Sequence, residues 1–129
     1  MRYVEHLVLV KVKRPFTPEE VSRMQALRAL DGVCWISCGA NYTHRGLGYN
    51  YGITVRFTRE EAEVAYQEHP MHVAVREEVI KPNVDMSQPN PILAIDYVHD
   101  QPPRYGLLAL GFACGLLAGV GLTALRLRK

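Results

Sequence analysis

The chain has 129 residues, of which 48% are hydrophobic and 22% charged, and its formal net charge at pH 7 is +2. That length allows one domain with a modest core and is too short for two. Much of the positive excess lies in the terminal residues 126–129 (RLRK), and no basic stripe with interleaved aromatic residues precedes them, so nucleic-acid binding has little support.

The cysteines do not describe a disulfide framework. Cys34, Cys38 and Cys114 form an odd and sparse set that suits a reducing compartment. Cys34 and Cys38 flank Trp35 in a strand-like segment and lack a second Cys or His pair at metal-binding spacing, so we interpret both as core residues. The N-terminus has neither a signal-peptide apolar region nor a basic, serine-rich transit segment.

The first predicted element is a strand over residues 3–12, whose side chains alternate between two faces. One face carries Val4, His6, Val8, Val10 and Val12, and the other carries Leu7 and Leu9. Because both faces are apolar, both need cover, and a second copy of the chain is the simplest cover for the face without helices. We therefore expect a homodimer that forms through the sheet.

A helix and a second strand follow. Thr17 is the expected N-cap, with Pro18 at the first helical position and Glu20 reaching back to the cap amide. The pair Asp31-Gly32 ends the helix, and residues 33–40 predict the second strand. The buried stripe of this helix consists of Val21, Met24, Leu27 and Leu30.

After a loop over 41–50, a third strand is predicted over 51–57. Thr58 repeats the capping box and opens a second helix that runs to about His69. Pro70 then restarts the chain into a helical piece that ends near Ile80.

The last strand of the head is predicted over 92–98, after an irregular connection marked by Pro82, Pro89 and Pro91. The order β-α-β-β-α-β is that of the ferredoxin-like α+β fold, a four-stranded antiparallel sheet with helices on one face.

The last quarter of the chain predicts a single C-terminal membrane anchor. Residues 105–125 contain no charged residue, and a helix of that length spans the roughly 30 Å hydrocarbon core of a bilayer. A buried core helix is disfavoured, because the head has no core large enough to surround a helix that is apolar on every face. We expect a head over 1–100, a linker over 101–104, a transmembrane helix over 105–125 and a basic tail over 126–129.

Glycines in the expected anchor point to a neighbouring helix. Gly111, Gly115 and Gly119 recur every fourth residue and would share one helix face, which opens it to close approach. Glycine is common in membrane helices generally, but two consecutive steps favour packing. We therefore expect contact with lipid and with transmembrane helices of a larger complex. The basic tip after a Gly-rich span favours a mitochondrial or plastid membrane.

Four stretches of the head resemble a known family. They are residues 5–11 (EHLVLVK), the strand 51–57 with its capped helix, residues 66–72 (YQEHPMH) and residues 95–97 (IDY). Together they resemble the stress-responsive dimeric α/β-barrel (Dabb) domain over roughly residues 3–98. The resemblance implies two ferredoxin-like subunits whose sheets face each other across a shared barrel, and the anchor lies outside its pattern.

The resemblance also implies a site. Olivetolic acid cyclase, a member of this family, closes the ring of a linear polyketide thioester by aldol condensation, and the motif match implies catalytic roles for Tyr66 and His72 and a pocket role for His6. An imidazole with a pKa near neutrality can remove a proton next to a carbonyl, and a phenol can hydrogen-bond the developing enolate. Tyr51 stands where the cyclase has a histidine, and its bulk would reshape the pocket. We also place His69 in this pocket and expect no cofactor.

The histidines allow two other interpretations. The His-Pro-x-His run falls at a helix break, where His69 could cap helix carbonyls and His72 could hydrogen-bond the sheet, so the run would serve the fold alone. His6, His69 and His72 could also form a metal site. No carboxylate or cysteine is placed to complete such a site, so we predict none.

Two functions follow from these observations. In the first, the protein is an accessory subunit whose glycine face docks into a larger membrane complex. In the second, it is a membrane-tethered enzyme or binder that acts on an apolar ketide-like or lipid-derived molecule through Tyr66 and His72. The anchor favours the first function, because a soluble cyclase needs no glycine-ridged helix.

Overall fold

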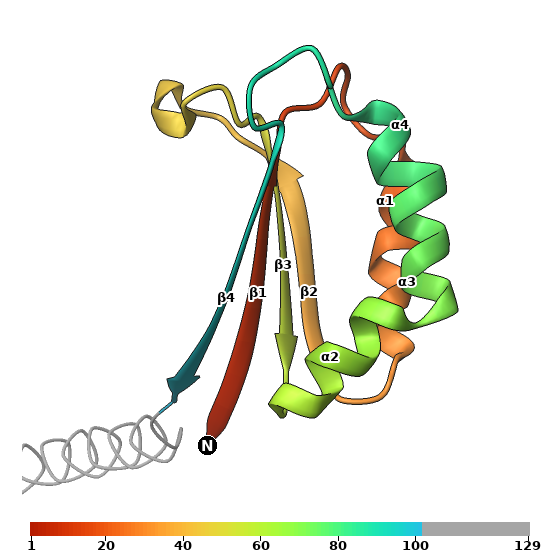
Figure 1. The fold of residues 1–129 in the computed structure, drawn as a ribbon, viewed down its shortest axis with the longest axis vertical. Coiled ribbons are helices and arrows are strands. Elements are labelled where there is room, and N and C mark those ends of the chain that lie inside the picture. Colours follow the sequence, from red (N-terminus) through yellow and green to blue (C-terminus); the bar gives the residue numbers. More distant parts are fainter. Residues whose placement is uncertain (102–129) are drawn as a thin grey trace, which may run out of the picture. The chain divides into compact units, whose positions relative to one another are not determined.

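The computed structural model describes residues 1–101 of the chain, and within them Arg2–Asp100 form one unit with its own core. The predicted β-α-β-β-α-β order is confirmed (Figure 1). The elements are β1 Arg2–Val10, α1 Pro18–Ala26, η1 Leu27–Ala29, β2 Val33–Ala40, η2 His44–Gly46, β3 Tyr51–Phe57, α2 Glu60–Glu68, α3 Pro70–Val75, η3 Arg76–Ile80, α4 Lys81–Asn83 and β4 Ile92–Asp100.

The four strands form one antiparallel sheet in the order β2-β3-β1-β4. The helices α1, α2, α3 and α4 all lie on one face of it, as the ferredoxin-like fold requires (Figure 1). The register sets His6 of the central strand β1 opposite Val55 on β3 and opposite Asp96 on β4. Because side chains of directly paired residues point to the same face, these three residues share the helix-covered face.

The core lies between the sheet and the helices. The rings of Phe57 and Tyr66 meet edge to face, with centroids 5.0 Å apart. Met24 and Leu27 of the predicted stripe are buried, and Val21 and Leu30 pack against the core at its margin. The largest fully buried side chains are Phe57, Met24, Val10, Val55, Val79 and Val84. Cys34 and Cys38 are half-buried, and Cys38 packs against this core.

The two predicted capping boxes have different outcomes. The first is confirmed: the amide of Glu20 donates to the Thr17 hydroxyl, and the Glu20 carboxylate accepts from the Thr17 amide. The second is wrong, because α2 begins at Glu60 and its N-cap is Arg59, without a side-chain cap. The amide of Thr58 donates to the carbonyl of Gly32 at 2.9 Å, which keeps Thr58 outside the helix.

The helical stretch after Pro70 runs further than predicted. It passes from α3 through the wider π-helical turn η3 into α4 and ends at Asn83, although the sequence predicts an end near Ile80. Pro82 falls in the first turn of α4, where its missing N–H costs no helical hydrogen bond.

The predicted ends of two strands also shift. Hydrogen-bonded pairing of β1 stops at Val10, and Val12 forms an isolated bridge with Val84 while its backbone amide and carbonyl bond the Asn50 side chain at 2.8 and 2.9 Å. At the other end of the head, β4 continues to Asp100, two residues beyond the predicted end.

No helix within the described residues covers the second face of the sheet, which we call the open face (Figure 1). It carries Trp35, Leu93, Ile95 and Tyr97, each between 42% and 50% exposed. It also holds a buried carboxylate, Glu5, whose Oε1 accepts from Arg56 Nε at 2.5 Å and lies 3.0 Å from His99 Nε2. Glu5 Oε2 has no hydrogen-bond partner among the described residues, so one acceptor on this face is unsatisfied.

The expected anchor and its glycine face (Gly111, Gly115 and Gly119) lie outside the described residues. Inside residues 1–101, none of the helices has the combination of length and apolar character that crossing a bilayer demands.

Candidate functional site

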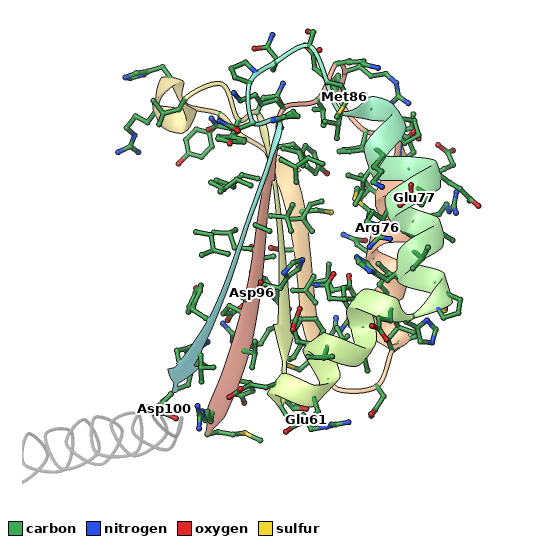
Figure 2. The ribbon with its side chains drawn as sticks, viewed as in Figure 1. Glu61, Arg76, Glu77, Met86, Asp96 and Asp100 are labelled. Atoms are coloured by element: carbon green, nitrogen blue, oxygen red, sulfur yellow. The ribbon has the colours of Figure 1, made fainter. Side chains whose placement is uncertain are left out.

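A cavity of about 180 Å³ lies between the sheet and the helical layer. Most of its wall is apolar, and polar side chains enter from β1, α2, α3, η3 and α4. Figure 2 shows Arg76 on the side of the helical layer that faces the sheet. The apolar wall consists of Val8, Met24, Leu27, Ile36, Ile53, Val55, Val75, Ile80, Ile92 and Ala94, and the polar residues are His6, Tyr66, Gln67, His72, Arg76 and Lys81.

His72 enters the cavity from α3 and is held in one orientation. Its Nδ1 lies 3.2 Å from the backbone carbonyl oxygen of Gln67, so Nδ1 carries the proton and donates. This leaves Nε2 as an acceptor. Burial lowers the pKa of His72 below its ordinary value, with a smaller opposing effect from the Gln67 carbonyl. The imidazole is therefore neutral at neutral pH and able to accept a proton.

Tyr66 enters from the last turn of α2 and packs against His72. The two ring centroids are 4.3 Å apart, with the ring planes tilted by 32°. The break at Pro70 turns the chain between α2 and α3, which brings these side chains together although six positions separate them. Burial raises the pKa of Tyr66 far above its ordinary value, so the phenol stays protonated. Among residues 1–101 its hydroxyl makes no hydrogen bond, which leaves it free to donate to a bound molecule.

His6 is the third predicted residue that lines the cavity, and it is only 8% exposed. Its Nδ1 lies 2.6 Å from Asp96 Oδ1, and its Nε2 lies 3.5 Å from Gln67 Nε2. Gln67 in turn donates to Glu63 Oε1 at 2.8 Å. Two carboxylates, Asp96 and Glu63, therefore lie beside His6, although the sequence predicts none there.

Sequence reasoning missed Glu63, Gln67 and Asp96 as members of the site. The signals were present: Glu63 and Gln67 are spaced i, i+4 and so share a helix face, and Asp96 pairs with His6 across β1 and β4. What the sequence does not show is that this face of α2 packs over that pair of strands.

Two predicted pocket residues lie outside the cavity wall. His69 is the N-cap of α3, and its Nδ1 accepts from the amide of Met71 at 3.1 Å. It thus caps amides at a helix start, not carbonyls at a helix end, and His72 bonds α2 and not the sheet. Tyr51 packs edge to face on Phe16, with centroids 4.7 Å apart, so its bulk does not shape this cavity.

The sheet order, the helices on one face and the cavity between these two layers define a ferredoxin-like domain of the α/β-barrel class. Residues 4–99 match the stress responsive A/B barrel domain (Dabb) family, and the chain belongs to this family. No curated protein matches the chain.

Several solved structures share this fold. A Dabb family protein with a ferredoxin-like fold from Mesorhizobium loti is 24% identical, with a TM-score of 0.58, and the match covers 78% of this chain and 100% of that one. A dimeric ferredoxin-like protein from Jannaschia sp. is 22% identical, with a TM-score of 0.57 and coverages of 74% and 97%. The hydroxynitrile lyase from Passiflora edulis is 13% identical, with a TM-score of 0.58 and coverages of 78% and 95%.

Proposed function

We propose that the head is a small-molecule enzyme whose cavity holds a carbonyl compound between Tyr66 and His72. One observation carries the proposal: Tyr66 and His72 meet inside one mostly apolar cavity, with ring centroids 4.3 Å apart. The Tyr66 phenol can still donate a hydrogen bond, and the His72 imidazole is neutral. His72 Nε2 removes a proton next to the carbonyl, and the Tyr66 hydroxyl donates a hydrogen bond to the oxygen that becomes negative.

The cavity also limits the substrate class. Its wall is apolar over most of its extent, which favours an alkyl or ketide-like chain over a sugar or a nucleotide. The family resemblance points to linear ketide thioesters as substrates. A structural neighbour described as a hydroxynitrile lyase adds a second group of compounds to test.

The test compares two histidines of the same motif. The full-length chain in mild detergent is assayed on a panel of ketide thioesters and hydroxynitriles. His72→Asn should lower turnover by roughly 10²- to 10⁴-fold, the range of general acid–base catalysis. His69→Asn, the matched control outside the cavity wall, should leave turnover within about twofold, because asparagine also caps helices. The proposal fails if the wild type turns over no compound in the panel or if both variants lose activity equally.

We propose further that two copies of the head pair through their open faces. The apolar side chains there are half exposed in a single copy, and Glu5 Oε2 lacks a donor that a second copy or trapped water would supply. Structural neighbours of this fold are described as dimeric.

A second candidate function, an accessory subunit of a membrane complex, is supported by the uncharged stretch 105–125 and its glycine spacing. Gly115→Leu keeps the length and apolar character of that stretch but blocks close approach of a second helix, at a cost of about 1–2 kcal/mol. Blue-native electrophoresis should then show loss of a large complex, with membrane insertion unchanged by alkaline extraction. Gly121→Leu, at a glycine outside the every-fourth-residue spacing, is the matched control. A Gly115→Leu protein that still migrates in the large complex removes this candidate.

A further inference from the structure

Donor atoms of metal-ligand type gather where α2 crosses the sheet. One donor atom each of His6, Glu63 and Asp96 lie within 4.8 Å of one another, although the three residues come from β1, α2 and β4. Asp96 lies midway along β4 (Figure 2), in register with His6. Gln67, one helical turn after Glu63, lies between Glu63 and His6.

Asp96 orients His6 in the way that second-shell carboxylates orient metal-binding histidines. With Nδ1 held by Asp96 at 2.6 Å, the remaining nitrogen, Nε2, points toward the side chains of α2. This fixes the tautomer with its lone pair on Nε2, the form that binds a metal ion. The Gln67 amide nitrogen lies 3.5 Å from Nε2, which is too long for a strong hydrogen bond.

The spacing of these groups is also close to that of a coordination shell. Ligands that bind a cation at about 2.1 Å are about 3.0–3.4 Å from one another in octahedral or tetrahedral geometry. The Gln67 amide is 2.8 Å from Glu63 Oε1 and 3.5 Å from His6 Nε2. A half-turn rotation of the Gln67 amide group would exchange its oxygen and nitrogen. Only this one side chain therefore needs to rotate for His6, Glu63 and Gln67 to present three ligand atoms.

We propose that His6 Nε2, Glu63 and Gln67 bind one divalent first-row cation such as Zn²⁺, with Asp96 holding the imidazole. A mixed set of one imidazole nitrogen and oxygen ligands suits these metals, and the two carboxylates balance the charge of the ion. Three protein ligands leave further coordination positions open, and His6 and Gln67 line the cavity. A cation there would polarise the carbonyl oxygen of a bound molecule.

Cobalt is the probe, because Co²⁺ replaces Zn²⁺ in such sites and gives visible absorption bands when ligands of this kind bind it. The full-length chain in mild detergent is titrated with Co²⁺ at pH 7, and Zn²⁺ is then added as a competitor. One Co²⁺ per chain should bind and should be displaced by Zn²⁺. Asp96→Asn should weaken binding by about 10- to 100-fold, as expected for the partner of a metal-bound histidine.

Two glutamates of α2 provide the matched comparison. Glu63→Gln removes a ligand charge and should weaken binding at least 10-fold, whereas Glu61→Gln, on an exposed side chain of the same helix (Figure 2), should bind Co²⁺ like the wild type. Circular dichroism confirms that each variant is folded. The absence of saturable binding, or equal affinity of Glu63→Gln and the wild type, overturns the site. No substrate is present, so a protein that binds Co²⁺ but turns over nothing would keep this inference and lose the proposed activity.

Discussion

Gly32 shows how one residue couples the end of the first helical segment to α2. Its φ of +75° is in the left-handed region, and a Cβ added there would lie 2.3 Å from the Cβ of Ala62. A side chain at this position is therefore both strained and in collision with a helix that cannot move without disturbing the core.

Gly32→Ala should consequently lower the free energy of unfolding by about 2–4 kcal/mol, the combined cost of left-handed backbone strain and overpacking. Gly39→Ala is the control, because a Cβ there meets nothing within 4 Å. Urea denaturation of residues 1–101, which contain the core described above, measures both changes. Equal effects of the two substitutions would show that the contact with Ala62 is not the cause.

At the same scale, the structure places three residues singled out by the family resemblance, His6, Tyr66 and His72, in the wall of one cavity. Tyr51 and His69 lie outside that wall, because a motif match assigns a residue to a strand or helix but does not say how far the cavity extends along it. Phe16, from the loop between β1 and α1, packs on Tyr51 with ring centroids 4.7 Å apart. Core side chains therefore fill the end of the sheet face where Tyr51 lies. No pattern in residues 13–17 signals this contact.

At the scale of elements, the start of α1 and the start of α2 have the same Thr-x-x-Glu spacing but different structures. Thr17→Ala removes a hydroxyl that accepts from the Glu20 amide and should cost about 1 kcal/mol of stability. Thr58→Ala removes a hydroxyl that contacts only the Arg59 guanidinium at 3.4 Å and should change stability by less than about 0.5 kcal/mol. Thermal unfolding of the two variants provides the comparison, and comparable losses would mean that Thr58 does cap α2.

The first capping box also predicts a pH dependence. Hydrogen bonds from Arg14 and from the Thr17 amide lower the pKa of Glu20 from 4.5 to about 2. Because the pKa is lower in the folded state, the stabilisation is complete above pH 4.5 and is lost as the pH falls toward about 2. Stability measured at pH 6 and at pH 3 should therefore fall less in Glu20→Gln than in the wild type. An unchanged pH dependence would show that Glu20 is not held by these bonds in solution.

The continuous helical stretch from Pro70 to Asn83 was not predictable from the sequence, because a proline such as Pro82 normally ends a helix before it. In the π-helical turn η3, just before that proline, backbone hydrogen bonds span five residues instead of four. As a result, Pro82 lies in the first turn of α4. Tertiary packing of Val79, which is almost fully buried, stabilises the stretch against this local preference.

At the scale of the whole molecule, the alternating pattern of β1 predicted an apolar open face but not its charges. Glu5, Arg56 and His99 form a polar cluster there, and the Arg56 guanidinium lies over the rings of Tyr3 and Trp35 at 5.4 and 5.9 Å from their centroids. Each residue of the cluster comes from a different strand, so only the register of the folded sheet brings them together. The cluster keeps this face from being a purely apolar patch in a single copy.

The proposed burial of this face in a dimer predicts a specific sensitivity to charge. Ile95→Arg places a cation in the middle of the open face, where a second copy would remove it from water, at a cost of several kcal/mol for each unpaired charge. Every 1.4 kcal/mol weakens association about tenfold, and both copies carry the change, so the variant should sediment as a monomer at micromolar concentration.

Val64→Arg is the matched control, because Val64 is 60% exposed on α2, on the opposite side of the sheet. It introduces the same charge and should leave the dimer intact. Sedimentation equilibrium of residues 1–101 measures all three proteins, and circular dichroism shows whether each one is folded. A wild-type head that sediments as a stable monomer removes the open face as the dimer interface. An Ile95→Arg dimer beside a Val64→Arg monomer would instead place the interface on the helical layer, where the cavity and its histidines would then be shared between two copies.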